Sequence, residues 1–295
     1  MADCTYTLDS LSLTGDDQYP DRICDQPFID YAWENHGFNY DYWQDGWGWD
    51  GCCNVTKPLG RAFASLWLLN YCAEDYENES YDGPMLNWAC RYVREQFDWC
   101  DDLRADCGGN TIATTSGCQW TRSFDEYKCV DYRRETLRTC AGWHWLVAWL
   151  CVLWTYITTG ACYLFGWVTT AFCTLYYGTV GGGQNVTLHL NYFYTQGGAV
   201  VRDVVVRAGT LVHEARHLGD HPHDADFPAG SQFGSGEGAD SSWGKEGAWM
   251  YHALFLWWFF AAGARTTLAM RNSAQTMGNI IITNAFATNP GFLIS

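Results

Sequence analysis

The sequence predicts a mainly α-helical protein made of three parts. These are an acidic head rich in cysteine and tryptophan over residues 1–120, one long hydrophobic helix over 121–180, and a small α+β domain over 181–295. Three observations indicate this division. Acidic residues are concentrated near the N-terminus, cysteines recur at a fixed interval in the middle, and a strand-like alternation followed by apolar helical segments begins after three consecutive glycines.

The charge of the chain is distributed unevenly. The 295 residues include 33 acidic and 17 basic side chains, which gives a formal net charge of −16. Residues 1–139 contain 25 of the acidic and 11 of the basic residues, whereas no Asp, Glu, Lys or Arg occurs between Arg138 and Arg202. Binding to nucleic acid is excluded, because phosphate recognition requires a basic face. Disorder as the main state is excluded, because 48% of the residues are hydrophobic.

The head is expected to be irregular and cross-linked. We predict that most of its nine cysteines pair as disulfides, because a hydrophobic core alone does not hold an acidic, irregular segment. The cysteine content and three N-glycosylation sequons, which begin at Asn54, Asn78 and Asn185, favour an oxidising compartment. The expected location is a membrane, the cell envelope or the extracellular space, and thiolate–metal binding is the alternative use of the cysteines. The nine are Cys4, Cys24, Cys52, Cys53, Cys72, Cys90, Cys100, Cys107 and Cys118.

Two helices are predicted within the head. The first runs from about Pro58, whose ring suits a first helical turn, to Asn70. The second runs from about Pro84 to Leu103, because apolar residues recur there on one helical face. Glycines and threonines over residues 108–117 then end the helical pattern.

The central segment contains a repeat of 11 residues. Five cysteines recur at this interval, and an aromatic residue stands three positions after each of them. This period is typical of a nearly straight helix or a right-handed supercoil. Adjacent cysteines lie about 16 Å apart along such a helix, so they do not bond to each other. We therefore predict a homo-oligomer formed through residues 121–180, in which the cysteines serve as small packing residues, interchain disulfides or metal layers. They are Cys129, Cys140, Cys151, Cys162 and Cys173.

Residues 142–180 are uncharged around the whole circumference of this helix. A helix of this kind is buried in a large assembly or in lipid. Its length of about 55–60 Å is nearly twice the thickness of the hydrocarbon core of a bilayer. The expected partners are therefore other copies of the chain, in a filament core or in a lipid bilayer.

The third part begins with an alternating segment over residues 186–194, which predicts a strand. An apolar helix through Val204 and Val212 is expected next, followed by a loop rich in Gly, Asp and Ser over residues 221–243. Residues 246–268 predict a very apolar helix, whose run of 18 uncharged residues suits either a membrane span or a buried core helix.

The segment most informative about chemistry is Leu211-Val-His-Glu-Ala-Arg-His-Leu-Gly-Asp-His-Pro-His-Asp224, which contains His-Glu-x-x-His. Positions i and i+4 of a helix share one face, so His213 and His217 can hold one zinc ion. Glu214 is then the candidate general base that takes a proton from the attacking water. A histidine pair with a purely structural role is the alternative.

This motif resembles that of the zincin superfamily of zinc metallopeptidases, over residues 186–260 at most. The resemblance implies a third protein ligand, for which there are three candidates, and His223 is the favoured one. His223 stands where metzincins place their last histidine, although Asp220 replaces the expected glycine. Glu246 fits a gluzincin-like pattern instead, and His221 is the third candidate.

The resemblance also implies roles for the surroundings of the site. The strand over residues 186–194 would bind an extended peptide at its edge, and Arg216, Asp220 and Asp224 would orient the histidines. Two functions follow as alternatives. One is a zinc-dependent hydrolase, most readily a peptidase, carried on a homo-oligomeric helical stalk. The other is a non-catalytic structural membrane or filament protein whose histidines bind metal.

Overall fold

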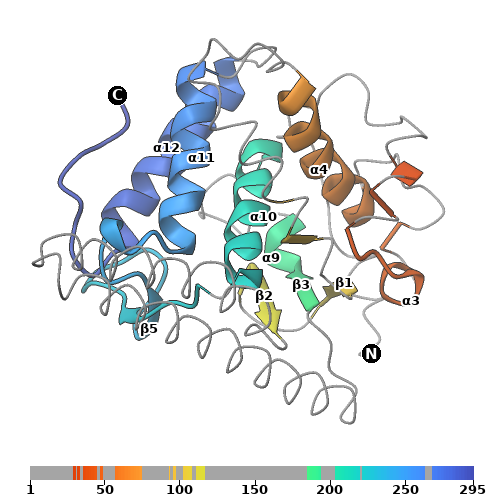
Figure 1. Ribbon diagram of the computed structural model, residues 1–295, viewed down its shortest axis with the longest axis horizontal. Coiled ribbons are helices and arrows are strands. Elements are labelled where there is room, and N and C mark those ends of the chain that lie inside the picture. The colour runs from red at the N-terminus through yellow and green to blue at the C-terminus, as the bar shows by residue number, and fades with distance from the viewer. Residues whose placement is uncertain are drawn as a thin grey trace, which may run out of the picture. The chain divides into compact units, whose positions relative to one another are not determined.

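Figure 1 shows the computed structural model of the chain, which forms two compact units, residues 1–115 together with 185–295, and residues 116–184. Apart from Ser116, the second unit lies outside the described residues, and so do the cysteine repeat and the long helix predicted over 121–180. The described residues are 29–30, 32–33, 36–44, 47–48, 57–74, 93, 96–97, 102–107, 111–116, 185–193, 203–219, 221–262 and 268–295.

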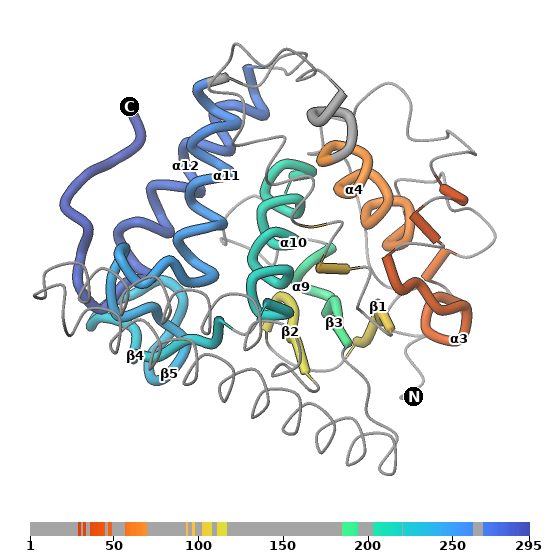
Figure 2. Tube along the Cα trace, viewed as in Figure 1, coloured from red at the N-terminus to blue at the C-terminus, as the bar shows by residue number. Residues whose placement is uncertain are grey.

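Long helices form the framework of the described part of the chain. They are α4 (Pro58–Glu74), α10 (Val204–Leu218), α11 (Ala248–Ala262) and α12 (Leu268–Asn284). α10 contacts the other three, and Figures 1 and 2 show it between α4 and the α11–α12 pair. The buried apolar side chains of these helices belong to one hydrophobic core.

α10 is held by capping contacts at both ends. The side chain of Asp203 accepts hydrogen bonds from the backbone N–H groups of Val205 and Val206, each over 3.1 Å. These bonds satisfy donors that have no partner within the helix. The N–H of Gly219 closes the other end by donating to two carbonyl oxygens of the last turn. Every residue of α10 except His217 is buried, as expected of a central core helix.

A small sheet joins segments that are far apart in the sequence. Its strands are β1 (Asp102–Asp106), β2 (Ala113–Ser116) and β3 (Asn185–His189), and their order is β1-β3-β2. β1 and β3 run parallel, with Asp102 opposite Asn185 and Asp106 opposite His189. Described parts of the predicted head and of the predicted C-terminal domain thus share one sheet.

The strand predicted over residues 186–194 is shorter in the structure. β3 ends at His189, and Leu190–Phe193 forms the short helix α9. The chain turns there because the side chain of Phe193 enters the core, while Nη1 of Arg61 donates to its carbonyl oxygen over 2.7 Å. Both sides of β3 are occupied by β1 and β2, so the edge expected to bind a peptide is not available on this strand.

The bounds of the other predicted helices are partly correct. α4 begins at Pro58, as predicted, and continues to Glu74. Leu103, predicted to end a helix, lies in β1, because it pairs in parallel with Val186 of β3. The apolar helix predicted over residues 246–268 is shorter and corresponds to α11, whereas α12 was not predicted.

Aromatic side chains anchor the N-terminal segment to the sheet. Trp43 ends the short helix α3 (Tyr40–Trp43) and is fully buried. Its ring lies 5.3 Å from that of Phe38 and 6.0 Å from that of Phe193, between ring centroids. Its Nε1 donates to the carbonyl oxygen of Leu103 over 2.8 Å. Trp43 therefore links α3, β1 and α9.

The segment between α10 and α11 is tied to the C-terminal end of the chain. It contains β4 (Ala225–Asp226), which pairs antiparallel with β5 (Glu237–Ala239), and the short 3₁₀ helix η3 (Trp243–Lys245). The backbone N–H of Asp240 donates to Ala285 over 3.0 Å, and the N–H of Ala287 donates back to Asp240 over 2.9 Å. These bonds fix the backbone of Asp240 beside the chain that follows α12.

The described residues form a mixed helical structure with small sheets. None of the helices in this part of the chain is long and apolar enough to cross a membrane. Among the cysteines predicted to pair in the head, Cys107 is disulfide-bonded. The pairing of the others stays a prediction.

Candidate metal centre

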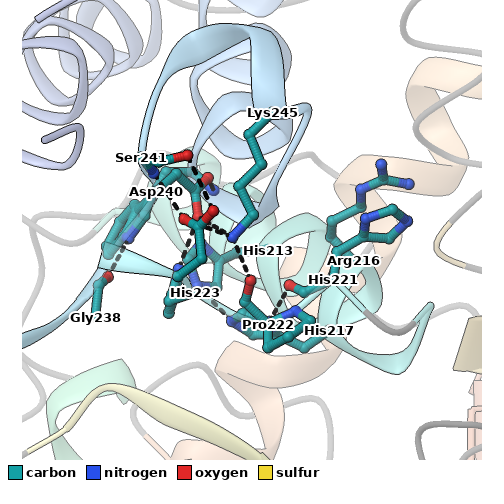
Figure 3. A network of polar contacts seen from close by, with 12 residues as sticks. His213, Arg216, His217, His221, Pro222, His223, Gly238, Asp240, Ser241 and Lys245 are labelled. Atoms are coloured by element: carbon teal, nitrogen blue, oxygen red, sulfur yellow. Dashed lines mark hydrogen bonds and ion pairs between the residues drawn. The ribbon is translucent and has the colours of Figure 1, made fainter. Parts of the chain in front are cut away.

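Three histidines converge where α10 ends and the next loop begins. His213 and His217 lie one helical turn apart on α10, and His223 lies in the loop before β4. One ring nitrogen from each histidine lies within 4.8 Å of the corresponding atoms of the other two. Figure 3 shows the three rings gathered together. Among the described residues, this is the group of three that has the geometry of a metal site.

The hydrogen bonds of the rings leave nitrogen lone pairs free to bind a metal. Nδ1 of His217 lies 2.9 Å from the carbonyl oxygen of His221. A carbonyl oxygen only accepts, so Nδ1 carries the proton and Nε2 carries a lone pair. This Nε2 lies 3.1 Å from Nε2 of His213. Two nitrogens that bind one zinc ion tetrahedrally lie about 3.3 Å apart, so the observed spacing suits a shared ion.

His223 is oriented by a buried carboxylate. Its Nδ1 lies 2.9 Å from Oδ1 of Asp240, whose side chain is 0% exposed. Because the carboxylate accepts, Nδ1 of His223 donates and its Nε2 is left for a metal ion. His217 and His223 therefore both use Nδ1 for a fixed oxygen partner, which is typical of metal-binding histidines.

Trp249 of α11 covers one side of the cluster. Its ring centroid lies 4.4 Å from that of His213 and 5.7 Å from that of His223. The indole Nε1 donates to the carbonyl oxygen of Gly238 over 2.7 Å, which fixes the ring. Trp249 therefore shields these two imidazoles from solvent and restricts their rotation.

Glu214 directly follows His213 on α10 and is buried. Its Oε2 accepts a hydrogen bond from Oγ1 of Thr115 on β2 over 2.7 Å. Burial raises the pKa of Glu214 to about 7, and the hydrogen bond from Thr115 opposes part of this rise. A carboxyl group with a pKa near neutrality suits proton transfer to and from a substrate.

Burial also keeps the imidazoles of His213 and His217 neutral. It lowers the pKa of His213 well below the usual value, and the nearby His217 and His223 lower it further. Burial lowers the pKa of His217 to about 4, with a smaller contribution from His223, while the hydrogen bond to His221 opposes the shift. Neutral imidazole is the form that binds metal ions.

Of the three candidates for the third ligand, His223 is the one that the structure places next to the other two histidines. The side chain of Glu246 is exposed. Its backbone carbonyl oxygen instead accepts from Nε and Nη2 of Arg216, over 2.9 and 2.7 Å. His221 contributes its carbonyl oxygen to His217, as described above.

The residues expected to orient the histidines have other contacts. The guanidinium of Arg216 lies over the ring of Tyr251, 3.9 Å from its centroid, and points away from the cluster in Figure 3. Asp224 accepts hydrogen bonds from the backbone and the hydroxyl group of Ser241, over 2.7 and 2.9 Å. Asp220 lies outside the described residues.

Two polar residues of the site were not identified from the sequence. Asp240 lies 17 positions from His223, and Thr115 lies 99 positions from Glu214. No local spacing links either residue to its partner. The only signal for Asp240 was that acidic residues are rare in the C-terminal half of the sequence. Rarity does not by itself indicate a role for this residue.

The donor set fits a borderline metal ion. Three imidazole nitrogens suit zinc and neighbouring transition metals, and a site with three protein ligands leaves a coordination position for water or substrate. No protein-family model, curated protein or solved structure matches this chain. The resemblance to zincins therefore rests on the His-Glu-x-x-His motif and on the cluster of three histidines.

Proposed function

We propose that the protein is a zinc-dependent hydrolase that cleaves peptide bonds, with zinc held by His213, His217 and His223. One observation carries this proposal. The cluster of three histidines lies beside a buried glutamate that is adjacent to the first histidine on the same helix. A structural zinc site usually has four protein ligands, whereas a catalytic site keeps one position open.

The ligands suit zinc because they are imidazole nitrogen donors with fixed rings. A zinc ion bound there would activate water and polarise the carbonyl group of a substrate. The carbonyl oxygen of His221 and the carboxylate of Asp240 hold the rings of His217 and His223 in the orientation that binding requires.

Glu214 is the proposed general acid and base. It would accept the proton of the attacking water and then donate it to the leaving amine. Its buried carboxyl group is held by Thr115, so its position does not depend on solvent. Thr115 belongs to β2, which is an edge strand of the three-stranded sheet. An extended peptide chain adding to β2 would therefore lie close to the residue that holds Glu214.

The test combines metal analysis with hydrolysis of a quenched fluorescent peptide library. Protein purified without chelators is expected to contain one zinc ion per chain. Glu214→Gln should keep that zinc and lose hydrolysis by about 10²- to 10⁴-fold, because only the proton-transfer group is changed. Glu246→Gln is the matched control, since it alters an exposed glutamate in the same way.

Two results would contradict the proposal in different ways. Protein without bound metal would overturn the metal site itself. Zinc bound by four protein ligands, with hydrolysis unaffected by Glu214→Gln, would indicate the alternative, a structural metal site.

We also propose, from the sequence, that the hydrolase is carried by a homo-oligomer formed through residues 121–180. The repeat of cysteine and aromatic residues supports this assembly. The cysteine content and the glycosylation sequons support a location in a membrane, the cell envelope or the extracellular space.

A further inference from the structure

We propose that Asp240 is the positioning residue that determines the affinity and geometry of the metal centre, because it holds the loop ligand His223 in place. This inference rests on the proposed metal site. His213 and His217 belong to a buried, capped helix, so their rings have a rigid backbone. His223 lies in a loop and depends on contacts from elsewhere.

Asp240 is itself fixed from several directions. Its backbone pairs with the segment after α12 through hydrogen bonds of 3.0 and 2.9 Å to Ala285 and Ala287. Its Oδ2 accepts from the backbone N–H of Trp249 over 3.1 Å, and its Oδ1 accepts from His223 over 2.9 Å. The two carboxylate oxygens therefore connect the start of α11 with the third ligand.

Lys245 contacts both residues that flank the same ligand. Its Nζ donates to the carbonyl oxygen of Pro222, the residue before His223. It also lies 2.8 Å from Oδ1 of Asp224, the residue after His223, and 3.8 Å from Oδ1 of Asp240. Figure 3 shows these contacts converging on the loop. Residues 240–245 thus hold both the ring of His223 and the backbone beside it.

This arrangement predicts how the third ligand responds to substitution. The carboxylate of Asp240 selects the tautomer of His223 that has a free lone pair at Nε2. An amide in its place accepts a weaker hydrogen bond and can also present its NH₂ group to the ring. The two helical histidines would keep their geometry, so a change at Asp240 should act on metal binding through His223.

The experiment measures zinc affinity by competition with a chromophoric chelator, together with the visible spectrum of the Co²⁺ form. Asp240→Asn should weaken zinc binding about 10- to 100-fold and alter the Co²⁺ spectrum. Asp226→Asn is the matched control, because it removes an exposed carboxylate from β4, three positions after His223. It should leave both readouts unchanged.

A double-mutant cycle separates positioning from a general effect on folding. In a His223→Ala background, Asp240→Asn should cause no further loss of affinity, because its target has been removed. If Asp240→Asn does not fold, Lys245→Met keeps Asp240 and should weaken zinc binding in the same direction.

Four outcomes would overturn the inference. A folded Asp240→Asn protein with wild-type zinc affinity and Co²⁺ spectrum would overturn this inference but not the proposed function. Losses of zinc affinity that add fully in the double-mutant cycle would do the same. If Asp240→Asn does not fold, Lys245→Met with unchanged zinc binding would overturn it. Wild-type protein that binds neither zinc nor Co²⁺ would overturn the proposed function with it.

Discussion

The hydroxyl group of Thr115 donates a hydrogen bond to Oε2 of Glu214 over 2.7 Å, although 99 positions separate the two residues. The contact links β2 of the small sheet to the helix that carries two of the three histidines. It is a direct polar connection between the N-terminal part of the chain and the proposed catalytic group. Its removal should change the behaviour of Glu214 without touching a metal ligand.

We predict that Thr115→Val shifts the acidic limb of the pH–rate profile to higher pH. The hydrogen bond stabilises the ionised carboxylate and lowers the pKa of Glu214, so its loss lets burial raise that pKa further. A general base must be ionised to act, so activity at neutral pH should fall. The measurement is the pH dependence of peptide-library hydrolysis.

Two controls accompany this variant. Thr115→Ser keeps a hydroxyl group and should keep the wild-type profile. Thr114→Val changes the neighbouring threonine, whose hydroxyl lies 3.1 Å from Nε2 of His189, and should leave the acidic limb in place. A Thr115→Val profile that superimposes on that of the wild type would refute the role of this bond.

The metal-free protein should show opposing pH effects on its free energy of unfolding. The pKa of His217 falls from 6.5 to about 4 on folding, so the unfolded chain binds more protons in that window and stability rises with pH. The pKa of Glu214 rises from 4.5 to about 7, so the folded chain binds more protons there and stability falls with pH. The two contributions partly cancel between 4.5 and 6.5.

Glu214→Gln removes one of these contributions. The metal-free variant should therefore gain more stability than the wild type when the pH rises from about 5 to about 7, as measured by urea unfolding. Glu246→Gln should behave like the wild type. An equal gain in wild-type and Glu214→Gln proteins would show that Glu214 does not titrate as described.

The cluster of three histidines was predictable because its pattern is local. Helical spacing places His213 and His217 on one face, and His223 follows within six positions, so a short segment contains the whole donor set. Glu214 is part of the same motif. The residues that hold Glu214 and His223 were not predictable. Thr115 and Asp240 are distant from them in the sequence and contact them only in the folded chain.

The same distinction between local and long-range signals applies to the helices and strands. α4 was located by Pro58 and an apolar run, which are local signals. The parallel pairing of β1 with β3 joins residues more than 80 positions apart, and a strand that short is defined by its partner. α12 mixes apolar with polar residues, and its packing against α11 explains why it forms a helix.

Assembly is tested by placing charge in the central repeat. Trp154 and Trp167 belong to its aromatic positions. Their joint replacement by aspartate should dissociate the proposed oligomer, because unpaired charges in an apolar layer are costly to bury. Light scattering measures the mass. A double variant with the mass of the wild-type particle would exclude this segment as the contact.

The last prediction concerns the space behind Asp240. A Cβ atom added at Gly247 would lie 2.3 Å from Oδ2 of Asp240, closer than any allowed contact. Gly247→Ala should therefore displace this carboxylate, cost about 1–3 kcal/mol of stability through overpacking, and weaken zinc binding through His223. Gly244→Ala is the matched control, since the nearest atom to its Cβ is Oγ of Ser242 at 4.0 Å. Thermal unfolding and zinc competition measure the two effects, and equal behaviour of the two variants would show that Asp240 can move without consequence for the metal centre.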